Sequence, residues 1–233
     1  MPVPYFYEPS LNIGVNQFTL SPETSKHCVQ VLRMQEGANI DITNGMGAVF
    51  NATIQSAHKA NSLVNIQRHQ SFAATNQKIT LGISLLKNAV RLEWLFEKAT
   101  EMGIYQIVPI ICERTIHERF KMDRMQNILQ SAMIQSQQAW LPLLCEPITL
   151  NAFMQQHKAS VNLIAHCEPS DKKNIKEISA LDDVNLLIGP EGDFSSAEIA
   201  TAATNNYTPI HLGPTRLRTE TAGIFALSVL KIF

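Results

Sequence analysis

The chain has 233 residues, of which 45% are hydrophobic and 17% are charged, and its formal net charge at pH 7 is −1. These values are ordinary for a globular protein with one large or two modest domains, and they argue against long disordered segments. The near-zero charge excludes a globally basic protein, so a polyanionic partner would have to bind a local patch of basic residues.

The sequence shows no sign of membrane insertion, secretion or metal binding. No apolar run reaches the ~20 residues that cross a bilayer, and the N-terminus lacks the basic start and apolar stretch of a signal peptide. The four cysteines are scattered and form no Cys-x-x-Cys pair, which favours reduced thiols in a cytoplasmic protein. None of the seven histidines stands at metal-ligand spacing from a cysteine, another histidine or a carboxylate, so we expect no metal site.

Residues 1–70 carry short strand-like runs and little helix. One helix is expected at residues 22–32, because Ser21 is a good N-cap and a proline follows it at the first helical position. The strand-like runs cover residues 38–43, 48–54 and 63–67. Asn44-Gly45 at the first break is a hairpin signal. This pattern predicts a small β-barrel or sandwich domain, followed by a linker of small and polar residues at 71–77.

From residue 78 to residue 233, strand-like runs alternate with helical patterns. The expected strands are residues 79–86, 106–112, 161–166, 184–188 and 209–212. The expected helices are residues 89–102, 122–138, 196–204 and 219 to the C-terminus. Ser195 and Glu198 have the spacing of a capping box at the start of one of them. The alternation predicts an α/β domain whose mostly parallel sheet has helices on both faces.

Two stretches of this second part repeat one design, in which a β-rich apolar run ends in Gly-Pro and a helical segment follows. The first runs over residues 186–192 with Gly189-Pro190, and the second over residues 210–214 with Gly213-Pro214. Glycine and proline together turn the chain sharply. Two such turns at the carboxyl ends of neighbouring strands would enclose a ligand-sized crevice, the usual place for a site in an open α/β sheet.

The motifs exclude several chemistries and favour one kind of ligand. The Gly-Pro-Glu-Gly loop is too short for a P-loop and lacks its lysine, and the chain has neither a G-x-G-x-x-G helix start nor a G-x-S-x-G elbow. Backbone groups at the two turns can instead read a flat heteroaromatic edge such as adenine, between apolar walls. Arg218, just before a helix start at Thr219, would attract an anionic group. The same residues are also compatible with ordinary turns and a capped helix start with a surface ion pair.

At these residues the chain resembles a known family. The two Gly-Pro stretches, the second continuing to residues 217–222, are similar to the paired signature of the RsmE family, the 16S ribosomal RNA uridine-N3 methyltransferases of the SPOUT superfamily. Further stretches resemble the family in the same order along the chain. They are Arg33-Met34 with Gly37, residues 46–54, residues 91–94 with 97–103, and residues 132–136 with Pro142.

The resemblance implies a fold, a cofactor and partners. Residues 1–70 would form a PUA-like β-barrel that binds RNA, residues 71–77 a linker, and residues 78–233 a SPOUT methyltransferase domain. In that domain the chain would form a deep trefoil knot, a rare exception among proteins. S-adenosylmethionine would be held in the knot between the two Gly-Pro turns. The enzyme would be a homodimer that methylates N3 of a specific uridine in 16S rRNA of the small ribosomal subunit.

The resemblance also implies roles for individual residues. Arg218 and Glu220 would be catalytic: a guanidinium is a poor base, so Arg218 would stabilise charge on uridine O2 or O4 or hold a phosphate. Glu220 would either accept a proton or orient Arg218. The cofactor would be bound by Leu187, Ile188, Gly189, Pro190, Glu191, Gly192, Leu212, Gly213, Leu217, Thr219, Thr221 and Ala222. RNA would be bound by Lys26, Arg33, Arg91, Arg114 and Arg216.

The chain departs from the family pattern at a few positions. Many relatives have glycine where this chain has Asp193, and arginine where it has Thr215; charged residues common in the long helix are replaced by Ile134 and Gln138. The departures at positions 134, 138 and 215 motivate one alternative, a non-catalytic RNA-binding or assembly protein with the same fold. A second alternative is a SPOUT methyltransferase acting on another RNA, because the fold alone does not fix the target.

Overall fold

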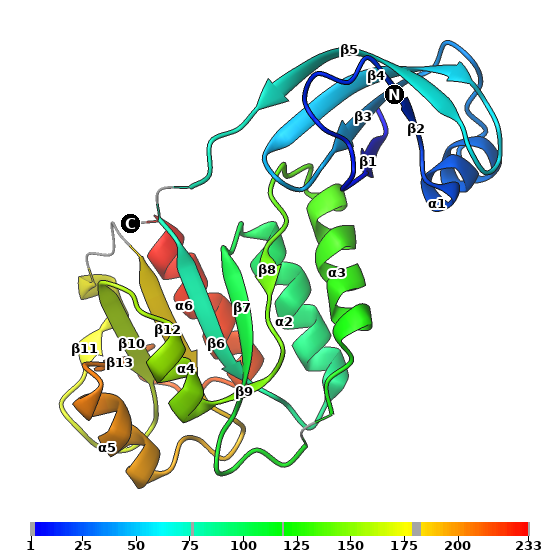
Figure 1. Cartoon of the computed structure of the whole chain (residues 1–233). Helices are drawn as coiled ribbons and strands as arrows, with labels where there is room; N and C mark the ends of the chain where they lie inside the picture. The colour runs from blue at the N-terminus through cyan, green and yellow to red at the C-terminus, as the bar shows by residue number, and fades with distance from the viewer. Residues whose placement is uncertain (1–2, 76, 118, 179–182, 233) are drawn as a thin grey trace. The chain divides into compact units, whose positions relative to one another are not determined.

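The structure is a computed structural model, and it describes residues 3–75, 77–117, 119–178 and 183–232 (Figure 1). Contacts between residues divide the chain into two units. The first comprises Met1–Ala74 and Gln130–Leu141, and the second comprises Thr75–Leu129 and Pro142–Phe233. The division expected from the sequence, into domains at residues 1–70 and 78–233 joined by a linker at 71–77, stays a prediction.

The first unit is built on a five-stranded sheet with the order β1-β3-β4-β5-β2. Its strands are β1 (Tyr5–Tyr7), β2 (Gln17–Thr19), β3 (Asn39–Thr43), β4 (Ala48–Ser56) and β5 (Leu63–Ser71). β1 pairs with β3 in parallel, and the other neighbours are antiparallel. The three expected strands are confirmed as β3, β4 and β5, although β5 continues to Ser71. The three-residue strands β1 and β2 were not predicted.

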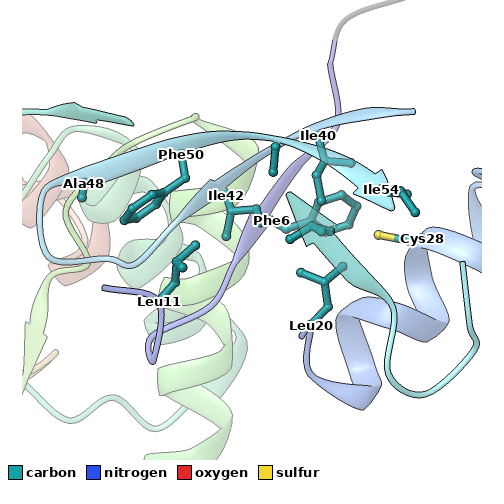
Figure 2. Packing of buried hydrophobic residues seen from close by; sticks show 11 residues of the cluster. Phe6, Leu11, Leu20, Cys28, Ile40, Ile42, Ala48, Phe50 and Ile54 are labelled. Carbon is teal, nitrogen blue, oxygen red and sulfur yellow. The ribbon is translucent and has the colours of Figure 1, made fainter. Parts of the chain in front are cut away.

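The hairpin between β3 and β4 forms as the Asn-Gly pair indicates. The side-chain Oδ1 of Asn44 accepts hydrogen bonds from the backbone N–H of Met46 at 2.9 Å and of Ala48 at 3.1 Å. Gly45 and Gly47 have φ values of +70° and +89°, which glycine adopts without strain. After this turn, alternate residues of β4 point into the core, among them Phe50 and Ile54. Figure 2 shows these side chains packed with others from the unit.

The expected helix at residues 22–32 is only partly α-helical. α1 (Pro22–Lys26) begins as predicted, because the Oγ of Ser21 accepts a hydrogen bond from the Thr24 N–H at 3.3 Å. It then widens into a π-helical turn, η1 (His27–Val31), in which the Leu32 N–H donates to the His27 carbonyl at 3.0 Å. Arg33 follows with a φ of +53° and ends the helical segment.

The second unit contains a parallel sheet with the order β11-β13-β10-β12-β6-β7-β8, and β9 also pairs with β7. Its strands are β6 (Ile79–Ser84), β7 (Gln106–Ile111), β8 (Leu143–Leu144), β9 (Ile148–Thr149), β10 (Val161–Ala165), β11 (Lys173–Asn174), β12 (Val184–Ile188) and β13 (Thr208–His211). The five expected strands are confirmed as β6, β7, β10, β12 and β13. The two-residue strands were not predicted, because so short a run carries no periodicity.

Helices cover both faces of this sheet, so the expected α/β class is confirmed (Figure 1). The helical elements are α2 (Ala89–Glu101), α3 (Met122–Gln135), α4 (Leu150–Gln156), η2 (Ile175–Glu177), α5 (Ser196–Thr204) and α6 (Thr219–Ile232). α2 and α6 pack together on one face, whereas α4 and α5 share a buried cluster with β7, β10 and β12 on the other. α4 was not predicted, although Thr149 caps it by accepting from the Ala152 N–H at 3.2 Å.

Two glycines mark close packing on the two faces of the sheet. On the α4 face, a Cβ added to Gly82 would lie 2.6 Å from the Cδ2 of Leu187. On the α6 face, a Cβ added to Gly223 would lie 2.8 Å from the Cδ1 of Leu95 in α2. A larger residue at either position would therefore have to push the neighbouring leucine side chain aside. The start of α6 thus packs closely against α2 and the sheet. The trefoil knot expected for this unit stays a prediction.

Two searches of the described residues complete the description of the fold. No helix among them combines the length and the apolar character that a membrane span requires. In the same residues, no group of three or more His, Cys, Asp or Glu side chains is arranged to hold a metal ion.

Candidate active site at the carboxyl ends of β10, β12 and β13

A cleft of about 520 Å³ opens where three neighbouring parallel strands of the second unit end. Ala165 at the end of β10 lies beside Ile188 of β12 and Ile210 of β13. The segments that follow these strands line the cleft together with the first turn of α6. Both Gly-Pro turns are among the lining residues, so the crevice predicted from the repeated design is present.

The loop after β12 is held in place by three separate segments of the chain. Arg114, which follows β7, donates from its Nη1 to the carbonyl of Gly192 at 2.8 Å and to that of Phe194 at 3.3 Å. The Oδ2 of Asp193 accepts from the Cys167 N–H, after β10, at 2.7 Å. The Oε1 of Glu191 accepts from the N–H of Lys87, which precedes α2, at 3.1 Å. The loop is therefore a preformed wall of the cleft.

Asp193 explains how this loop works without a second glycine. Its φ is +65°, a value that suits glycine best and that aspartate tolerates better than most residues. Its Oδ1 also accepts from the N–H of Phe194 at 2.8 Å. A Cβ on Gly189 would lie 3.0 Å from the ring of Phe194, so a larger residue here would require Phe194 to shift. The departure at position 193 therefore keeps the backbone conformation and adds a tie to β10.

The loop after β13 is more open. Gly213 has a φ of +116°, and a Cβ placed on it would meet no atom within 4 Å. The residues from Gly213 to Arg216 are exposed, while Leu212 and Leu217 at the two ends are half-buried. The second wall thus offers apolar side chains at its ends and small residues with free space between them. This combination suits a flat, partly apolar ligand.

The first turn of α6 brings an ion pair to the cleft. The Oε1 of Glu220 lies 3.6 Å from the Nε of Arg91 in α2, and the two side chains are 10% and 38% exposed. Arg218 is exposed, and within the part of the chain that the structure describes, its guanidinium forms no hydrogen bond or ion pair. The sequence left open whether Glu220 orients Arg218; the structure pairs it with Arg91 instead.

Most of the site residues expected from the sequence line the cleft. They are Arg91, Ile188, Gly189, Pro190, Glu191, Leu212, Gly213, Arg216, Leu217, Arg218, Thr219, Glu220 and Ala222. Three of the expected cofactor-binding residues are not among the lining residues. Leu187 is fully buried on the α4 face, Gly192 lies beside Arg114, and Thr221 is exposed on α6.

The expected RNA-binding residues are distributed over both units. Arg91 and Arg216 line the cleft, whereas Arg114 clamps the loop after β12. Lys26 ends α1 in the first unit, and Arg33 follows η1; both are exposed. The structure shows their positions, and their contact with RNA stays a prediction.

The sequence reading missed the third wall of the cleft, which follows β10. His166, Cys167 and Lys172 line it, and Lys172 donates from its Nζ to the His166 carbonyl at 2.7 Å. Burial, together with the charge of Lys172, lowers the pKa of His166 below its ordinary value, against the opposing charges of Asp193 and Glu168. No Gly-Pro pair marks this strand end. The signal that was available is that His166 closes a predicted buried strand, because ligands bind beyond the carboxyl ends of such strands.

Family models match both units. A model described as an RNA methyltransferase domain matches residues 73–231, and one described as an RNA methyltransferase PUA domain matches residues 20–67. Among curated proteins, the chain is 28% identical to "Ribosomal RNA small subunit methyltransferase E" from Synechocystis, over 90% of this chain and 71% of that protein.

Solved structures agree with this match over the whole chain. A probable rRNA-methyltransferase from Porphyromonas gingivalis is 33% identical, covers 99% of both chains and superposes with a TM-score of 0.91. A putative methyltransferase from Legionella pneumophila, solved with the bound cofactor SAM (S-adenosylmethionine), is 32% identical and has a TM-score of 0.87. That comparison covers 100% of this chain and 98% of the Legionella chain.

Proposed function

The chain belongs to the RsmE family of RNA methyltransferases, and from this premise we propose that it methylates N3 of a specific uridine in 16S ribosomal RNA of the small subunit. The relatives named as small-subunit rRNA methyltransferases support this choice of substrate. The observation that carries the proposal is the cleft. There, the two Gly-Pro turns and the start of α6, which hold the family signature, form one continuous lining.

The methyl donor we propose is S-adenosylmethionine, which the Legionella relative binds. The cleft fits such a molecule. Ile188, Leu212 and Leu217 provide apolar surface for an adenine ring, and the space around Gly213 lets a ligand approach the backbone closely. Backbone groups of both turns would read the edge of the ring. When bound, S-adenosylmethionine supplies an electrophilic methyl group on its sulfonium.

The protein would contribute mainly alignment and electrostatic stabilisation. Placing uridine N3 in line with the methyl carbon and the sulfur is worth up to ~7–11 kcal/mol in favourable cases. N3 would first lose its proton to solvent, which leaves negative charge shared by N3, O2 and O4, and the bond from N3 to the methyl carbon would then form as the bond from carbon to sulfur breaks. Arg218, exposed and unpaired among the described residues, would stabilise this negative charge at O2 or O4 before the methyl group is transferred. The uridine must also be unstacked from its neighbours to enter the cleft.

Glu220 has a different role in this proposal. Because it pairs with Arg91, its carboxylate orders the first turn of α6 against α2 and so positions Arg218 through the backbone. The backbone carbonyl of Arg218 accepts from the Ala222 N–H at 2.7 Å, which places Arg218 at the helix start. The positive end of the helix dipole then adds to its charge.

RNA docking and assembly complete the proposal. The first unit, with the exposed Lys26 and Arg33 flanking its short helical segment, would hold the rRNA. A second copy of the chain would complete a homodimer. In support, α2 exposes two large apolar side chains one helical turn apart, Val90 at 68% and Trp94 at 43%.

Mass spectrometry of rRNA from a strain lacking the gene tests the proposal. We expect one 3-methyluridine to disappear from 16S rRNA and to return when the wild-type gene, but not its Arg218→Ala variant, is restored. Loss of a methyl group from another RNA would instead support the alternative target. Unchanged RNA, together with no binding of S-adenosylmethionine in calorimetry, would support the non-catalytic alternative.

A further inference from the structure

His166 lines the cleft, and both nitrogens of its ring are buried without a hydrogen-bond partner among the described residues. Its side chain directly follows β10, between the strands whose ends carry the two Gly-Pro turns. The residue is only 7% exposed. Neither Nδ1 nor Nε2 has a hydrogen-bond partner in the described ranges of the chain. Buried polar side chains are hydrogen-bonded in the large majority of cases, so an exception in a ligand cleft calls for an explanation.

The backbone around His166 is firmly tied, so the orphaned ring is not the result of a loose segment. Lys172 donates to the carbonyl of His166 at 2.7 Å, and the next backbone N–H, that of Cys167, donates to Asp193 at 2.7 Å. Both ties leave the imidazole free. Keeping a polar ring in such a place costs stability relative to an apolar side chain of similar shape.

The charged groups around the ring favour its neutral form. Burial and Lys172 lower the pKa of His166, and Asp193 and Glu168 oppose them with smaller effects. His211, on the neighbouring strand β13, lines the same cleft. A neutral imidazole has one N–H donor and one nitrogen acceptor. It therefore complements an uncharged ligand group that can both donate and accept, such as a hydroxyl.

Resting on the function proposed above, we propose that the imidazole of His166 contacts the bound cofactor and exchanges a hydrogen bond with a hydroxyl of its nucleoside part. The amino-acid end of the cofactor carries a carboxylate, for which the guanidinium of Arg216 on another wall of the cleft is a better partner. The sulfonium is cationic and would disfavour a protonated imidazole nearby. The ribose is the part whose chemistry matches a neutral ring.

The test compares ligands and variants by calorimetry. S-adenosylhomocysteine carries both the nucleoside and the amino-acid end, whereas methylthioadenosine carries the nucleoside alone. His166→Phe removes the polar atoms, while His166→Asn and His166→Gln place an amide near Nδ1 or Nε2. His157→Phe is the matched control: His157 stacks on Phe153, with ring centroids 4.7 Å apart, and is not among the residues that line the cleft.

We expect His166→Phe to weaken both ligands about 10-fold or more, the cost of one lost hydrogen bond. Its melting temperature without ligand should equal or exceed that of the wild type, because the orphaned polar group is gone. At least one of the two amide variants should stay within about threefold of the wild-type affinity, and His157→Phe should not differ from the wild type. If His166 had a purely structural role, replacing it would instead lower the melting temperature. The asparagine and glutamine variants would then lose as much ligand affinity as the phenylalanine variant.

Unchanged affinity of His166→Phe for both ligands would overturn this inference and leave the proposed function intact. A loss seen with S-adenosylhomocysteine but not with methylthioadenosine would overturn the assignment to the nucleoside part. Failure of the wild-type protein and of His157→Phe to bind either ligand would refute the proposed function itself, and this inference with it.

Discussion

Changing Arg91 to Met tests whether the ion pair with Glu220 holds the first turn of α6. The substitution keeps much of the apolar stem of Arg91 and removes its charge, leaving a carboxylate that is only 10% exposed without its partner. Exposed pairs contribute about 0–1 kcal/mol, and orphaning one member of a fully buried pair costs about 3–5 kcal/mol. Because the Arg91 side chain is 38% exposed, solvent screens the pair, and we expect an intermediate loss of about 1–2 kcal/mol.

A double-mutant cycle measured by urea unfolding separates the pair from its surroundings. Glu220→Gln alone should cost less than Arg91→Met, because a half-exposed guanidinium can be hydrated. The double variant should recover most of the loss, because no buried charge remains. Arg124→Met is the matched control, since Arg124 pairs with Glu93 but its own side chain is 60% exposed; its loss should be smaller. Additive losses, in which the double variant loses the sum of what the two single variants lose, would refute the coupling.

The same variants decide the role of Glu220 in catalysis. If Glu220 only orders the start of α6, the Arg91→Met/Glu220→Gln protein should keep measurable methyl transfer once its stability is restored. If Glu220 accepts the proton of uridine N3, every variant with glutamine at this position should lose activity regardless of stability. The second result would contradict the positioning role that the pair with Arg91 indicates.

Three further predictions concern Arg218, Gly223 and the reactivity of the cysteines. Arg218→Ala should bind S-adenosylmethionine within about twofold of the wild type but lose about 100-fold or more in methyl transfer; a parallel loss of affinity in calorimetry would contradict its assignment to the RNA. Gly223→Val should lower the unfolding free energy by about 1–3 kcal/mol, because its Cβ would lie 2.8 Å from a leucine of α2; an unchanged urea midpoint would rule out this close approach. Burial raises the pKa of Cys28 to about 11 and that of Cys112 to about 12, so at pH 8 iodoacetamide should label the exposed Cys167 first, as peptide mass mapping would show. Rapid labelling of either buried thiol would count against the packing described here.

Helices and strands whose sequence signals lie within a few neighbouring residues could be predicted with the correct bounds. β12 and α5 have the expected bounds, and α5 begins with the full capping box: the Ser195 Oγ accepts from the Glu198 N–H, and the Glu198 carboxylate accepts from the Ser195 N–H. These interactions lie within four residues. The short strand β1 could not be predicted in this way, because three residues gain their register only by pairing with β3.

The end of α3 depends on contacts far along the chain. The sequence predicts helix to Gln138, but the structure ends it at Gln135, and Gln137 has a φ of +54°. The following residues bond within the first unit: the Gly47 N–H donates to the Ala139 carbonyl at 2.9 Å, and the Leu141 N–H donates to the Gly45 carbonyl at 2.9 Å. These tertiary bonds outweigh a helical propensity that is weak at this end.

Two details of the site geometry could not be predicted from the sequence, for simple geometric reasons. Leu187 and Ile188 were both expected at the cofactor, but successive strand residues point to opposite faces of a sheet. β12 is buried on both faces, so its apolar run carries no alternation that shows which of the two faces the cleft. Glu220 was considered as a partner of Arg218, but helix residues two apart do not face each other. Its actual partner, Arg91, lies on a helix that the sequence does not connect with α6.

The two Gly-Pro turns look alike in the sequence, yet they differ in how firmly the rest of the structure holds them. The first is tied to three separate segments of the chain. Arg114, after β7, donates to a carbonyl of its loop, and the side chains of Asp193 and Glu191 accept from backbone N–H groups after β10 and before α2. The second has an exposed centre, with open space beside Gly213. A cleft with one clamped wall needs little reorganisation to orient a ligand, because the entropy of ordering that wall has been lost on folding. The open wall then supplies the access that a bulky nucleoside requires.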